Sequence, residues 1–564
     1  MRRLTCVLLP LVLAAVVYDR AAAEWKVWTV TETRRVLRED VAEDSVDVRL
    51  AAARGEWESF QVLMRSDQPA QGINVVPGDL AGLDGAEIAA STARLHRQHQ
   101  FHLTIPTCRN DAFRPGWYPD ALIPFNHPTT RQPLSGGRFD AVPFDLPANE
   151  THGFWVDVFV PTEAKPGEYR GTYQVTAADG GAIEIPVALK VWDFALPRVS
   201  TLQTALGSPA DRMRSYYSQR AKDGKETEPD DWAAVDEQCA EMLSRHRINA
   251  TPPPGSLAPV AQTDGTFRIP DEQIHAFREF VDRHHVNAFC VPHPRSAVKD
   301  PIEQRERLHA WLKSWDRAAE QLDRPDVVFY TYLKDEPNEE EAYHYVQKWG
   351  RAIREAKSVV KVMVVEQTWT QNEAWGDLYG AIDIWCPLFP LFKAESAAKR
   401  QALGETIWTY TALCQRDKTP WWHTDFPLLN YRVPTWIAWR YRMRGLLYWG
   451  GMSYWRDVDD PWTEPGTLDR RDRNPKLMYN GEGSLVYPAR AVGYDGIAPS
   501  LRVKALRDAI EDYEYLAILE RLGQTDEAEK LVVPLAGSWF EWETDPGAYE
   551  KARERLAEII TTNQ

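Results

Sequence analysis

From about Ser200 onward, short apolar segments alternate with long, charged stretches of helical period. This alternation is typical of βα units, whose strands pair in parallel. Eight segments are candidate strands, and eight parallel strands close a (β/α)8 barrel of the TIM type. The candidate strands are residues 202–206, 248–251, 288–291, 327–333, 361–365, 382–386, 407–411 and 445–449.

Helical periodicity fills several of the intervals between these strands. The expected helices are residues 232–246, 271–286, 302–323 and 339–357. Asp230 and Asp231 stand where a side chain would cap the first of them. The spacing therefore predicts a barrel with an outer layer of helices.

The part of the chain before Pro197 has a different texture. Residues 60–65, 154–160, 171–176 and 183–192 are short runs that alternate apolar and polar side chains or are wholly apolar, with turn sequences between them. Two packed sheets are the natural arrangement for such a set. We predict a multidomain α and β protein with a β-sandwich at 24–197, a barrel at 198–525 and a helical tail at 526–564.

A helical stripe marks residues 501–522, formed by Leu506, Ile510, Tyr513 and Ala517. Acidic side chains lie beside this stripe, and we expect them to form a solvated face. They are Asp508, Glu511, Asp512 and Glu514.

The chain starts with Met-Arg-Arg, an apolar run over 7–17 and three alanines at 21–23, the layout of a cleavable export signal. We expect residues 1–23 to be removed and the protein to be secreted or periplasmic. No later stretch reaches the roughly 18 apolar residues of a spanning helix, so no membrane span is expected. Five cysteines follow the signal, an odd number that leaves at least one thiol unpaired.

The net charge and the aromatic content limit the classes of molecule that the protein is expected to bind. The net charge of −16 argues against nucleic acid and anionic membranes. The chain has 23 Trp and 22 Tyr, whose flat faces suit stacking on pyranose rings but also suit an aromatic core. Composition alone leaves both interpretations open. No oligomeric state is predicted.

Two adjacent acids, Asp335 and Glu336, end the fourth candidate strand. Active sites of such barrels lie at the carboxyl ends of the strands, and glycoside hydrolysis usually needs two carboxylates. Neighbours on a regular strand point to opposite faces, so these acids converge only if the backbone leaves the strand, as Pro337 allows. The alternative is that Asp335 caps, and Glu336 decorates, a helix starting near Pro337.

Other side chains at strand ends are candidates for a sugar pocket. The aromatic candidates, each of which also suits the core, are Trp385, Trp408, Tyr410 and Trp449. Gln367 follows the fifth strand. Asp425 and Arg432, before the last strand, either bind sugar hydroxyls or pair with one another.

We expect no metal and no cofactor. His96, His99 and His102 are spaced three apart, but in a β-rich block this spacing scatters them over both faces of a sheet. No phosphate-binding loop, serine elbow or zinc-binding helix motif stands out.

The string Tyr332-Leu-Lys-Asp-Glu-Pro resembles the catalytic motif of glycoside hydrolase family 123. Further strings along most of the chain are similar to the same family. They are Ala53-Arg-Gly-Glu-Trp-Glu-Ser-Phe-Gln, Trp408-Thr-Tyr, Arg432 followed by Trp436, Gly445-Leu-Leu-Tyr-Trp-Gly, Leu485-Val-Tyr-Pro, and Arg502-Val-Lys-Ala-Leu-Arg-Asp-Ala-Ile-Glu-Asp-Tyr-Glu-Tyr.

This resemblance implies a retaining, exo-acting β-N-acetylgalactosaminidase whose substrate supplies its own nucleophile, the 2-acetamido group. Glu336 would be the general acid and then the base, and Asp335 would orient the acetamido group. Tyr410 is our candidate for the hydroxyl that bonds the acetamido carbonyl. The expected partner is a glycan or glycoconjugate. Two alternatives stay open, namely a hydrolase of the same fold acting on another sugar and a non-catalytic exported glycan-binding protein.

Overall fold

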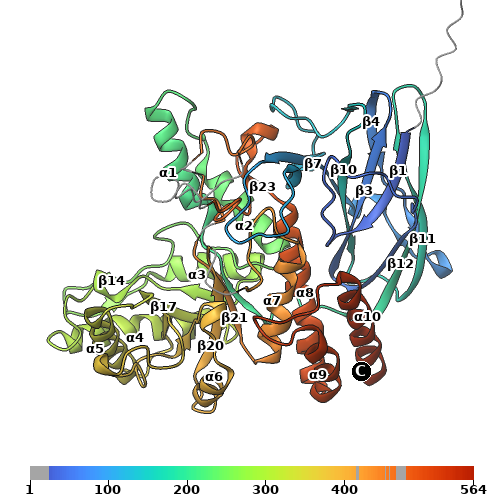
Figure 1. Ribbon diagram of the computed structural model, residues 1–564. Helices are drawn as coiled ribbons and strands as arrows, with labels where there is room; N and C mark the ends of the chain where they lie inside the picture. Colours follow the sequence, from blue (N-terminus) through green and yellow to red (C-terminus); the bar gives the residue numbers. More distant parts are fainter. Residues whose placement is uncertain (1–24, 414–417, 451, 456–457, 465–477) are drawn as a thin grey trace, which may run out of the picture.

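The computed structural model describes residues 25–413, 418–450, 452–455, 458–464 and 478–564 (Figure 1). The predicted export signal, residues 1–23, lies outside the described residues. A body of long strands at one side and a barrel-like body at the other flank one long helix, α8 (Leu501–Arg521).

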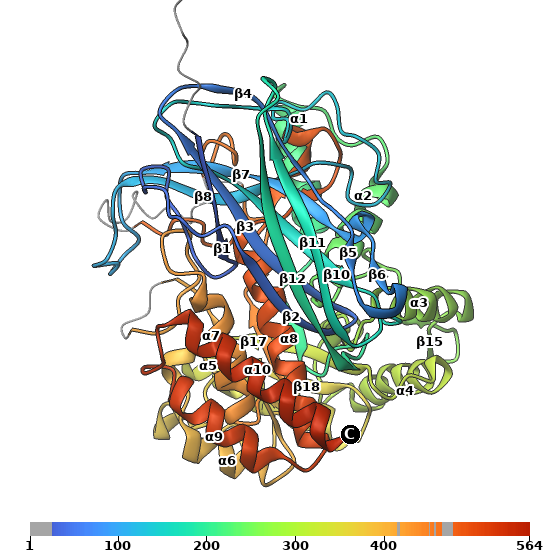
Figure 2. The same cartoon turned by 90° about the vertical axis from the view of Figure 1, so that its right-hand side faces the viewer.

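The first body is a β-sandwich, seen with its strands toward the viewer in Figure 2. One sheet has the order β1-β3-β10-β7-β8, which are Trp25–Thr31, Glu56–Ser66, His152–Val160, Arg94–Leu103 and Gly116–Pro124. The other has the order β2-β12-β11-β4-β9, which are Val48–Arg54, Ala182–Ala195, Gly167–Thr176, Ala70–Val76 and Phe144–Leu146. Two short strands, β5 (Leu80–Ala81) and β6 (Glu87–Ile88), extend the second sheet.

The two sheets of the sandwich differ in how many of their faces are buried. In β11, Tyr169, Tyr173 and Val175 are buried while their neighbours are exposed, as expected for a strand with one wet face. In contrast, β3 and β10 are buried on both faces. The second face of this sheet packs against α8, which joins the sandwich to the rest of the protein.

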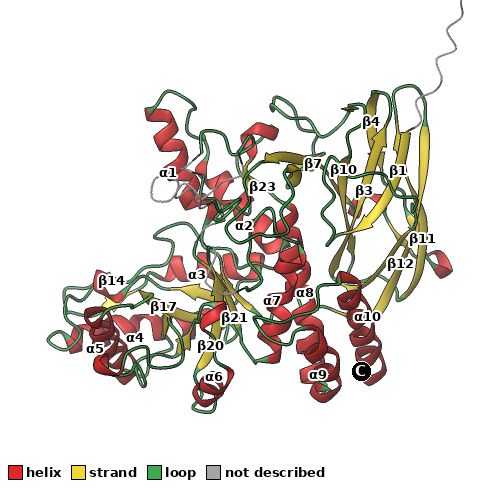
Figure 3. Cartoon of the chain, viewed as in Figure 1, coloured by secondary structure: helices red, strands yellow, loops and turns green. Residues whose placement is uncertain are grey.

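The second body is a parallel sheet of seven strands that curls into a nearly closed barrel with helices around it (Figure 3). Its order is β13-β21-β20-β19-β18-β17-β16, which are Gln203–Ala205, Gly445–Tyr448, Thr406–Thr411, Ile384–Trp385, Lys361–Val365, Val328–Asp335 and Ala288–Cys290. Seven of the eight predicted strands thus form the sheet. The TIM-like fold prediction is confirmed, with one strand position vacant.

The predicted strand at 248–251 was wrong, because this segment makes no ladder with its neighbours. Asn249 instead spans the gap between β13 and β16. Its Nδ2 donates to the Thr204 carbonyl at 3.0 Å and to Asn287 Oδ1 at 2.7 Å. The backbone N–H of Asn287 donates back to Asn249 Oδ1 at 3.0 Å. Three prolines follow Thr251 and lack the N–H groups that a strand needs.

Helices surround the barrel and form the C-terminal part of the chain (Figure 3). Asp231 caps α2 by accepting from the N–H groups of Ala233 and Ala234, as the sequence predicted. Apart from α8, the helices are α1 (Pro209–Lys222), α2 (Trp232–Arg245), α3 (Asp271–His284), α4 (Arg305–Leu322), α5 (Glu340–Glu355), α6 (Ala394–Gln401), α7 (Leu429–Arg440), α9 (Thr525–Leu535) and α10 (Pro546–Asn563).

Small elements complete the fold. Short strand pairs are formed by β14 (Val260–Ala261) with β15 (Phe267–Arg268) and by β22 (Tyr487–Pro488) with β23 (Ile497–Ala498). Over the described parts of the chain, no helix combines the length and the apolar character needed to cross a membrane.

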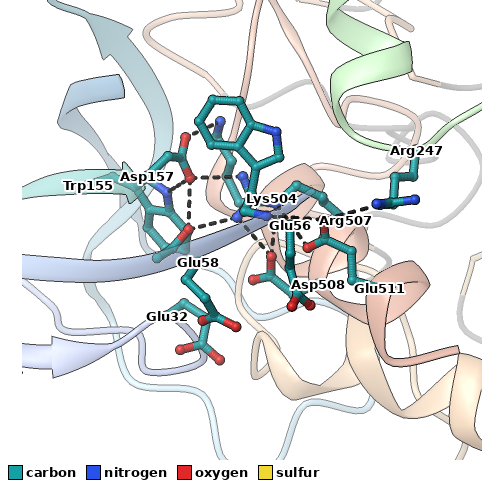
Figure 4. Close-up of polar contacts among 12 residues, drawn as sticks. Glu32, Glu56, Glu58, Trp155, Asp157, Arg247, Lys504, Arg507, Asp508 and Glu511 are labelled. Atoms are coloured by element: carbon teal, nitrogen blue, oxygen red, sulfur yellow. Dashed lines mark hydrogen bonds and ion pairs between the residues drawn. The ribbon is translucent and has the colours of Figure 1, made fainter. Parts of the chain in front are cut away.

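The acids of α8 do not form the solvated face that the sequence suggested. Glu511, Asp512 and Glu514 are buried, and Asp508 is half-buried beside Arg507. The apolar stripe identified only one of the faces that α8 buries, because its other sides meet the sandwich, α7 and α10. Figure 4 shows charged side chains of the sandwich beside those of α8. Buried carboxylates need partners, and basic side chains from several elements supply them.

Asp512 belongs to one of these networks. Arg432 on α7 donates to Asp512 from Nε at 2.5 Å and to Glu32 at 3.0 Å, and it also pairs with Glu550 on α10. Trp436 Nε1 donates to the same Asp512 carboxylate at 2.8 Å. The side chains of Arg432 and Asp512 are each 1% exposed, so the centre of this network lies out of water, while Glu550 at its edge is 31% exposed.

We predict that Arg432→Met lowers the free energy of unfolding by about 3–5 kcal/mol, because it leaves buried carboxylates without their main counter-charge. Urea denaturation followed by tryptophan fluorescence measures the change. The matched control is Arg444→Met, whose pair with Glu520 is 37% exposed on both sides and should contribute less than about 1 kcal/mol. Equal losses in the two variants would contradict this account of the α7–α8 contact.

Candidate active site

A β-bulge sets the direction of Asp335. Along β17 and β18, Tyr332 pairs with Met363 but Lys334 pairs with the next residue, Val364, so β17 contains an extra residue. Bulges of this kind re-aim side chains near functional sites. Here the Tyr332 hydroxyl donates to Asp335 Oδ1 at 2.7 Å, although regular alternation would place these two side chains on opposite faces.

Glu336 lies just beyond the end of β17, in a conformation that few non-glycine residues adopt. Its φ is 35°, in the left-handed region. Such backbone costs on the order of 1–3 kcal/mol and occurs where surrounding structure holds it in place. The Tyr410 hydroxyl, from β20, donates to Glu336 Oε1. The backbone therefore leaves the strand between Asp335 and Glu336. This is the exit that the two acids need if their side chains are to point to the same side.

The helix-capping interpretation does not fit the geometry. Helix α5 begins at Glu340, and its N-cap residue is Glu339. Asp335 and Glu336 are both exposed, and the hydrogen bonds of their carboxylates come from tyrosines on barrel strands. These acids belong to the mouth of the barrel.

A cavity of about 360 Å³ lies at this mouth, with Asp335 in its wall. Its lining includes Tyr330 and Tyr332 from β17, and Tyr448 and Trp449 from the end of β21. Burial and the neighbouring carboxylates raise the pKa of Tyr332 and of Tyr410, so both hydroxyls keep their protons and act as donors. The Asp335 carboxylate, several tyrosines and the indole of Trp449 thus line one polar and aromatic pocket. Glu336 follows Asp335 in sequence and accepts from the Tyr410 hydroxyl.

The indole of Trp449 is fixed by a buried acid, Glu482. Trp449 Nε1 donates to Glu482 Oε1 at 2.6 Å, and the backbone N–H of Leu413 donates to the same oxygen at 3.1 Å. Burial raises the Glu482 pKa to about 7. His423 Nδ1 lies 3.4 Å from Glu482 Oε2, and burial lowers the pKa of this histidine to about 3, so its ring is neutral.

A third acid follows the strand next to β17. Glu366, directly after β18, is 4% exposed, and the Tyr343 hydroxyl donates to its Oε1 at 3.4 Å. Burial raises the Glu366 pKa to about 8, and the charge of Glu336 acts in the same direction. Glu366 is therefore protonated at neutral pH. Gln367, a predicted pocket residue, is buried beside it.

Two of the predicted aromatic residues lie inside the protein. Trp408 fills the barrel interior, where its ring packs edge-on against that of Tyr330 with 5.2 Å between the ring centroids. Position 445 requires glycine, because a Cβ there would overlap the Trp408 indole. Trp385 lies on the opposite side of the sheet, among the helices, where its Nε1 donates to Glu405 at 2.7 Å. The structure therefore places Tyr410 and Trp449 at the mouth, and Trp408 and Trp385 in packing positions.

Asp425 and Arg432 pair neither with one another nor with the two candidate acids. Asp425 accepts from the Thr107 N–H at 2.8 Å and from the Thr107 hydroxyl at 2.6 Å, which ties this connection to the front domain. Arg432 is enclosed in the Asp512 network. Thr107 lies 318 residues from Asp425, and Asp512 lies 80 residues from Arg432, so local spacing gave no sign of these partners.

Sequence reasoning missed Glu366 and Glu482. Glu366 carries the signal used for Asp335, an acid at the end of a predicted strand, and the same rule identifies it. Glu482 lies in a long connection with no strand before it, and its sequence gave no signal. Within the described ranges, no group of three or more His, Cys, Asp or Glu side chains is arranged to hold a metal ion.

Comparison with known families agrees with this geometry. The model of the glycoside hydrolase 123 catalytic domain matches residues 305–519, and the model of the glycoside hydrolase 123 N-terminal domain matches residues 28–177. Together the matches cover more than half of the chain and include Asp335 and Glu336. The chain is therefore a glycoside hydrolase. It belongs to glycoside hydrolase family 123.

One solved structure supports the same fold, that of a family 123 relative. A family 123 glycoside hydrolase from Clostridium perfringens, described in a study of glycolipid glycan hydrolysis, is 13% identical with a TM-score of 0.64, covering 95% of this chain and 97% of its own. A family 39 glycoside hydrolase from Bacteroides cellulosilyticus WH2 is 10% identical with a TM-score of 0.32, covering 78% of this chain and 80% of its own. No curated protein sequence matches the chain.

The raised pKa of Glu366 predicts a pH effect on stability. Its folded pKa of about 8 exceeds the ordinary value of 4.5, so between these values the folded protein binds more protons than the unfolded chain. Stability from this group is therefore present at low pH and is lost as pH rises toward 8. In Glu366→Gln this loss should be absent, so the variant should gain up to a few kcal/mol relative to wild type between pH 5 and 8.

Urea denaturation at several pH values tests this prediction. Glu340→Gln removes an exposed carboxylate at the start of α5 and is the matched control, for which the difference from wild type should stay constant between pH 5 and 8. A constant difference for Glu366→Gln as well would contradict the raised pKa.

Proposed function

We propose that this protein is a retaining, exo-acting β-N-acetylgalactosaminidase that uses the 2-acetamido group of its substrate as the nucleophile. The observation that carries the proposal is the pair Asp335 and Glu336 at the barrel mouth, with a tyrosine hydroxyl donating to each carboxylate. Family membership supports a glycosidase, and the acid pair supports the mechanism.

The two acids have different tasks in this mechanism. The acetamido oxygen attacks C1 of the sugar, a C1–O bond forms, and the glycosidic C–O bond breaks. Glu336 gives its proton to the departing oxygen, while the Asp335 carboxylate accepts a hydrogen bond from the acetamido N–H as positive charge develops on the oxazolinium ring. Water then attacks C1, Glu336 takes its proton, and the ring opens to give the sugar with its original β configuration.

This mechanism removes the constraint that ordinary retaining enzymes obey. They need a nucleophilic carboxylate about 5–5.5 Å from the acid, on the other side of the scissile bond. When the substrate supplies the nucleophile, both acids can work near the same sugar atoms, so neighbours in sequence suffice. The left-handed backbone of Glu336 turns its carboxylate away from a regular strand direction.

The pocket wall offers further groups to the sugar. The Tyr410 hydroxyl donates to Glu336 in the free protein, and we propose that it turns to the acetamido carbonyl when substrate binds. Trp449, held by Glu482, offers its indole face to the pyranose ring. The substrate would be a glycan or glycoconjugate with a terminal β-linked N-acetylgalactosamine, and the predicted export signal would place the enzyme outside the cytoplasm.

The acid pair predicts unequal effects of mutation. Glu336→Gln should lower kcat/KM by about 10²–10⁴-fold on aryl β-N-acetylgalactosaminides with poor leaving groups, and less when the leaving group needs no proton. Asp335→Asn should lower activity for both kinds of leaving group, because the acetamido group must be oriented in either case. Steady-state kinetics with a matched pair of aryl glycosides measures both effects.

Glu339→Gln, three residues further along the same exposed segment, is the control and should keep wild-type kinetics. Full activity of Glu336→Gln on the poor leaving group would overturn its role as the acid. Equal turnover of the corresponding glycoside without a 2-acetamido group would keep the glycosidase and overturn substrate assistance.

Tyr410 gives a second test of the pocket. Tyr410→Phe should lower kcat by about 10- to 100-fold, because the hydroxyl that orients Glu336 or the acetamido group is lost. The melting temperature should change little. The control is Tyr441→Phe, whose hydroxyl donates to the Gly537 carbonyl at 3.1 Å. Equal kinetics of the two variants would contradict a role for Tyr410 at the reacting sugar.

A further inference from the structure

A second cavity, of about 300 Å³, lies where the sandwich meets the helices of the barrel domain. Strands β3, β7 and β10 supply one side, and α2 and α8 supply the other. None of the residues in its lining takes part in the pocket that holds Asp335. This junction cavity has the size of a monosaccharide rather than of a single water molecule.

The junction cavity is strongly cationic. Five basic side chains line it, and Asp157 is the one carboxylate among its described lining residues. The basic residues are Arg94, Arg131, Arg245, Lys504 and Arg507. Asp157 is already engaged, since Lys504 Nζ lies 2.6 Å and Arg507 lies 2.9 Å from its carboxylate oxygens (Figure 4). Arg245 pairs with Glu241, which does not line the cavity. The charge of Asp157 therefore leaves Arg94 and Arg131 without a counter-charge in the described part of the lining.

Arg94 and Arg131 have no carboxylate partner among the residues that the structure describes. The hydrogen bonds of Arg94 go to backbone carbonyls such as those of Ser91 and Ala93, both at 3.1 Å. Arg131 likewise donates to the Ala93 carbonyl at 3.1 Å. Burial lowers the Arg94 pKa to about 10, and the charges of Arg131 and Arg245 act in the same direction, although Asp157 and Glu241 act against them.

Two buried histidines in the lining carry polar atoms without partners. His246 is 4% exposed, and its Nδ1 lies 2.7 Å from the Met242 carbonyl, which can only accept. Its Nδ1 therefore carries the proton, and Nε2 is an acceptor that no group in the described chain supplies with a donor. His96, 7% exposed, similarly has an unpartnered Nδ1.

The unpaired arginines and the buried histidines of the cavity indicate which chemical groups a ligand must carry. Unpaired arginines favour an oxyanion, and the acceptor on His246 favours a ligand with a hydroxyl donor. Trp57, Phe125 and Tyr494 add aromatic rings to the lining, and such rings suit contact with a pyranose. A phosphate or sulfate ion alone supplies the negative charge. It lacks the hydroxyl donors of a sugar and is too small to fill the cavity.

We propose that the junction cavity is a second glycan-binding site, which takes a sugar unit bearing an oxyanion such as a sulfate, phosphate or carboxylate group. Arg94 and Arg131 bind the oxyanion, His246 accepts from a sugar hydroxyl, and an aromatic face covers the ring. The site holds an acidic sugar of a larger glycan while the barrel mouth acts elsewhere. It does not depend on the identity of the sugar that the barrel cleaves.

Isothermal titration calorimetry of the full-length mature protein tests the site with glucose 6-sulfate, inorganic sulfate and glucose at constant ionic strength. We expect glucose 6-sulfate to bind more tightly than sulfate, and glucose to give no heat. Arg94→Gln should raise the Kd for glucose 6-sulfate by about tenfold or more. Arg131→Gln is a second variant, expected to weaken binding in the same direction.

Arg97→Gln is the matched control. Arg97 is on the same strand, β7, and also donates to a backbone carbonyl, that of Asp140 at 2.9 Å, but it does not line the cavity. Its Kd should equal that of wild type, and Trp449→Ala at the barrel mouth should leave it unchanged too. The proposal is overturned if glucose 6-sulfate does not bind, if both arginine variants bind as tightly as Arg97→Gln, or if sulfate binds as tightly as the sulfated sugar.

Discussion

The buried guanidinium of Arg502 connects the three parts on which the active site depends. Its Nε lies 2.9 Å from both oxygens of Asp120, on strand β8 of the sandwich. Its Nη1 donates to the Gly481 carbonyl at 2.8 Å, and its Nη2 donates to that of Ser484. Since Arg502 belongs to α8 and is 0% exposed, one planar cation joins the sandwich, the central helix and the loop 481–484.

That loop carries Glu482, which in turn fixes the indole of Trp449 at the barrel mouth. The position of one pocket wall therefore follows from a contact between domains, through Asp120, Arg502 and Glu482. The opposite wall depends on the barrel itself, where the bulge in β17 aims Asp335 and the left-handed turn places Glu336 near Tyr410. Buried ion pairs add little net stability, but an unpaired charge is costly, so such a network favours one arrangement of its parts.

Periodicity in the sequence predicted the elements whose pattern is local. The strands at 361–365 and 445–449 and the helix at 232–246 were found because a sheet face or a helix stripe repeats within a few residues. The strand at 248–251 was wrong because apolar character does not report whether a neighbour is in register. Asn249, a polar side chain, closes this part of the barrel.

The candidate site was predictable where chain order and strand ends coincide, as for Asp335, Glu336 and Tyr410, whose roles remain predictions. It was not predictable where partners are distant in sequence. The sequence made Arg432 a candidate for sugar binding and suggested that the acids of α8 form a solvated face. Both interpretations arose because a sequence does not show that a helix is enclosed on several sides. Trp408 and Trp385 lie on adjacent strands, and only the sheet shows that one faces the barrel interior and the other the helices.

In the mechanism that we propose, the acetamido oxygen of the substrate, and no side chain of the enzyme, attacks the sugar. The most direct measurement is kcat/KM for aryl β-N-acetylgalactosaminides in which the acetyl hydrogens are replaced stepwise by fluorine. Each fluorine withdraws electrons and weakens the carbonyl oxygen as a nucleophile, so the account predicts a steep fall in kcat/KM from no fluorine to three. A rate that does not change across the series would contradict it.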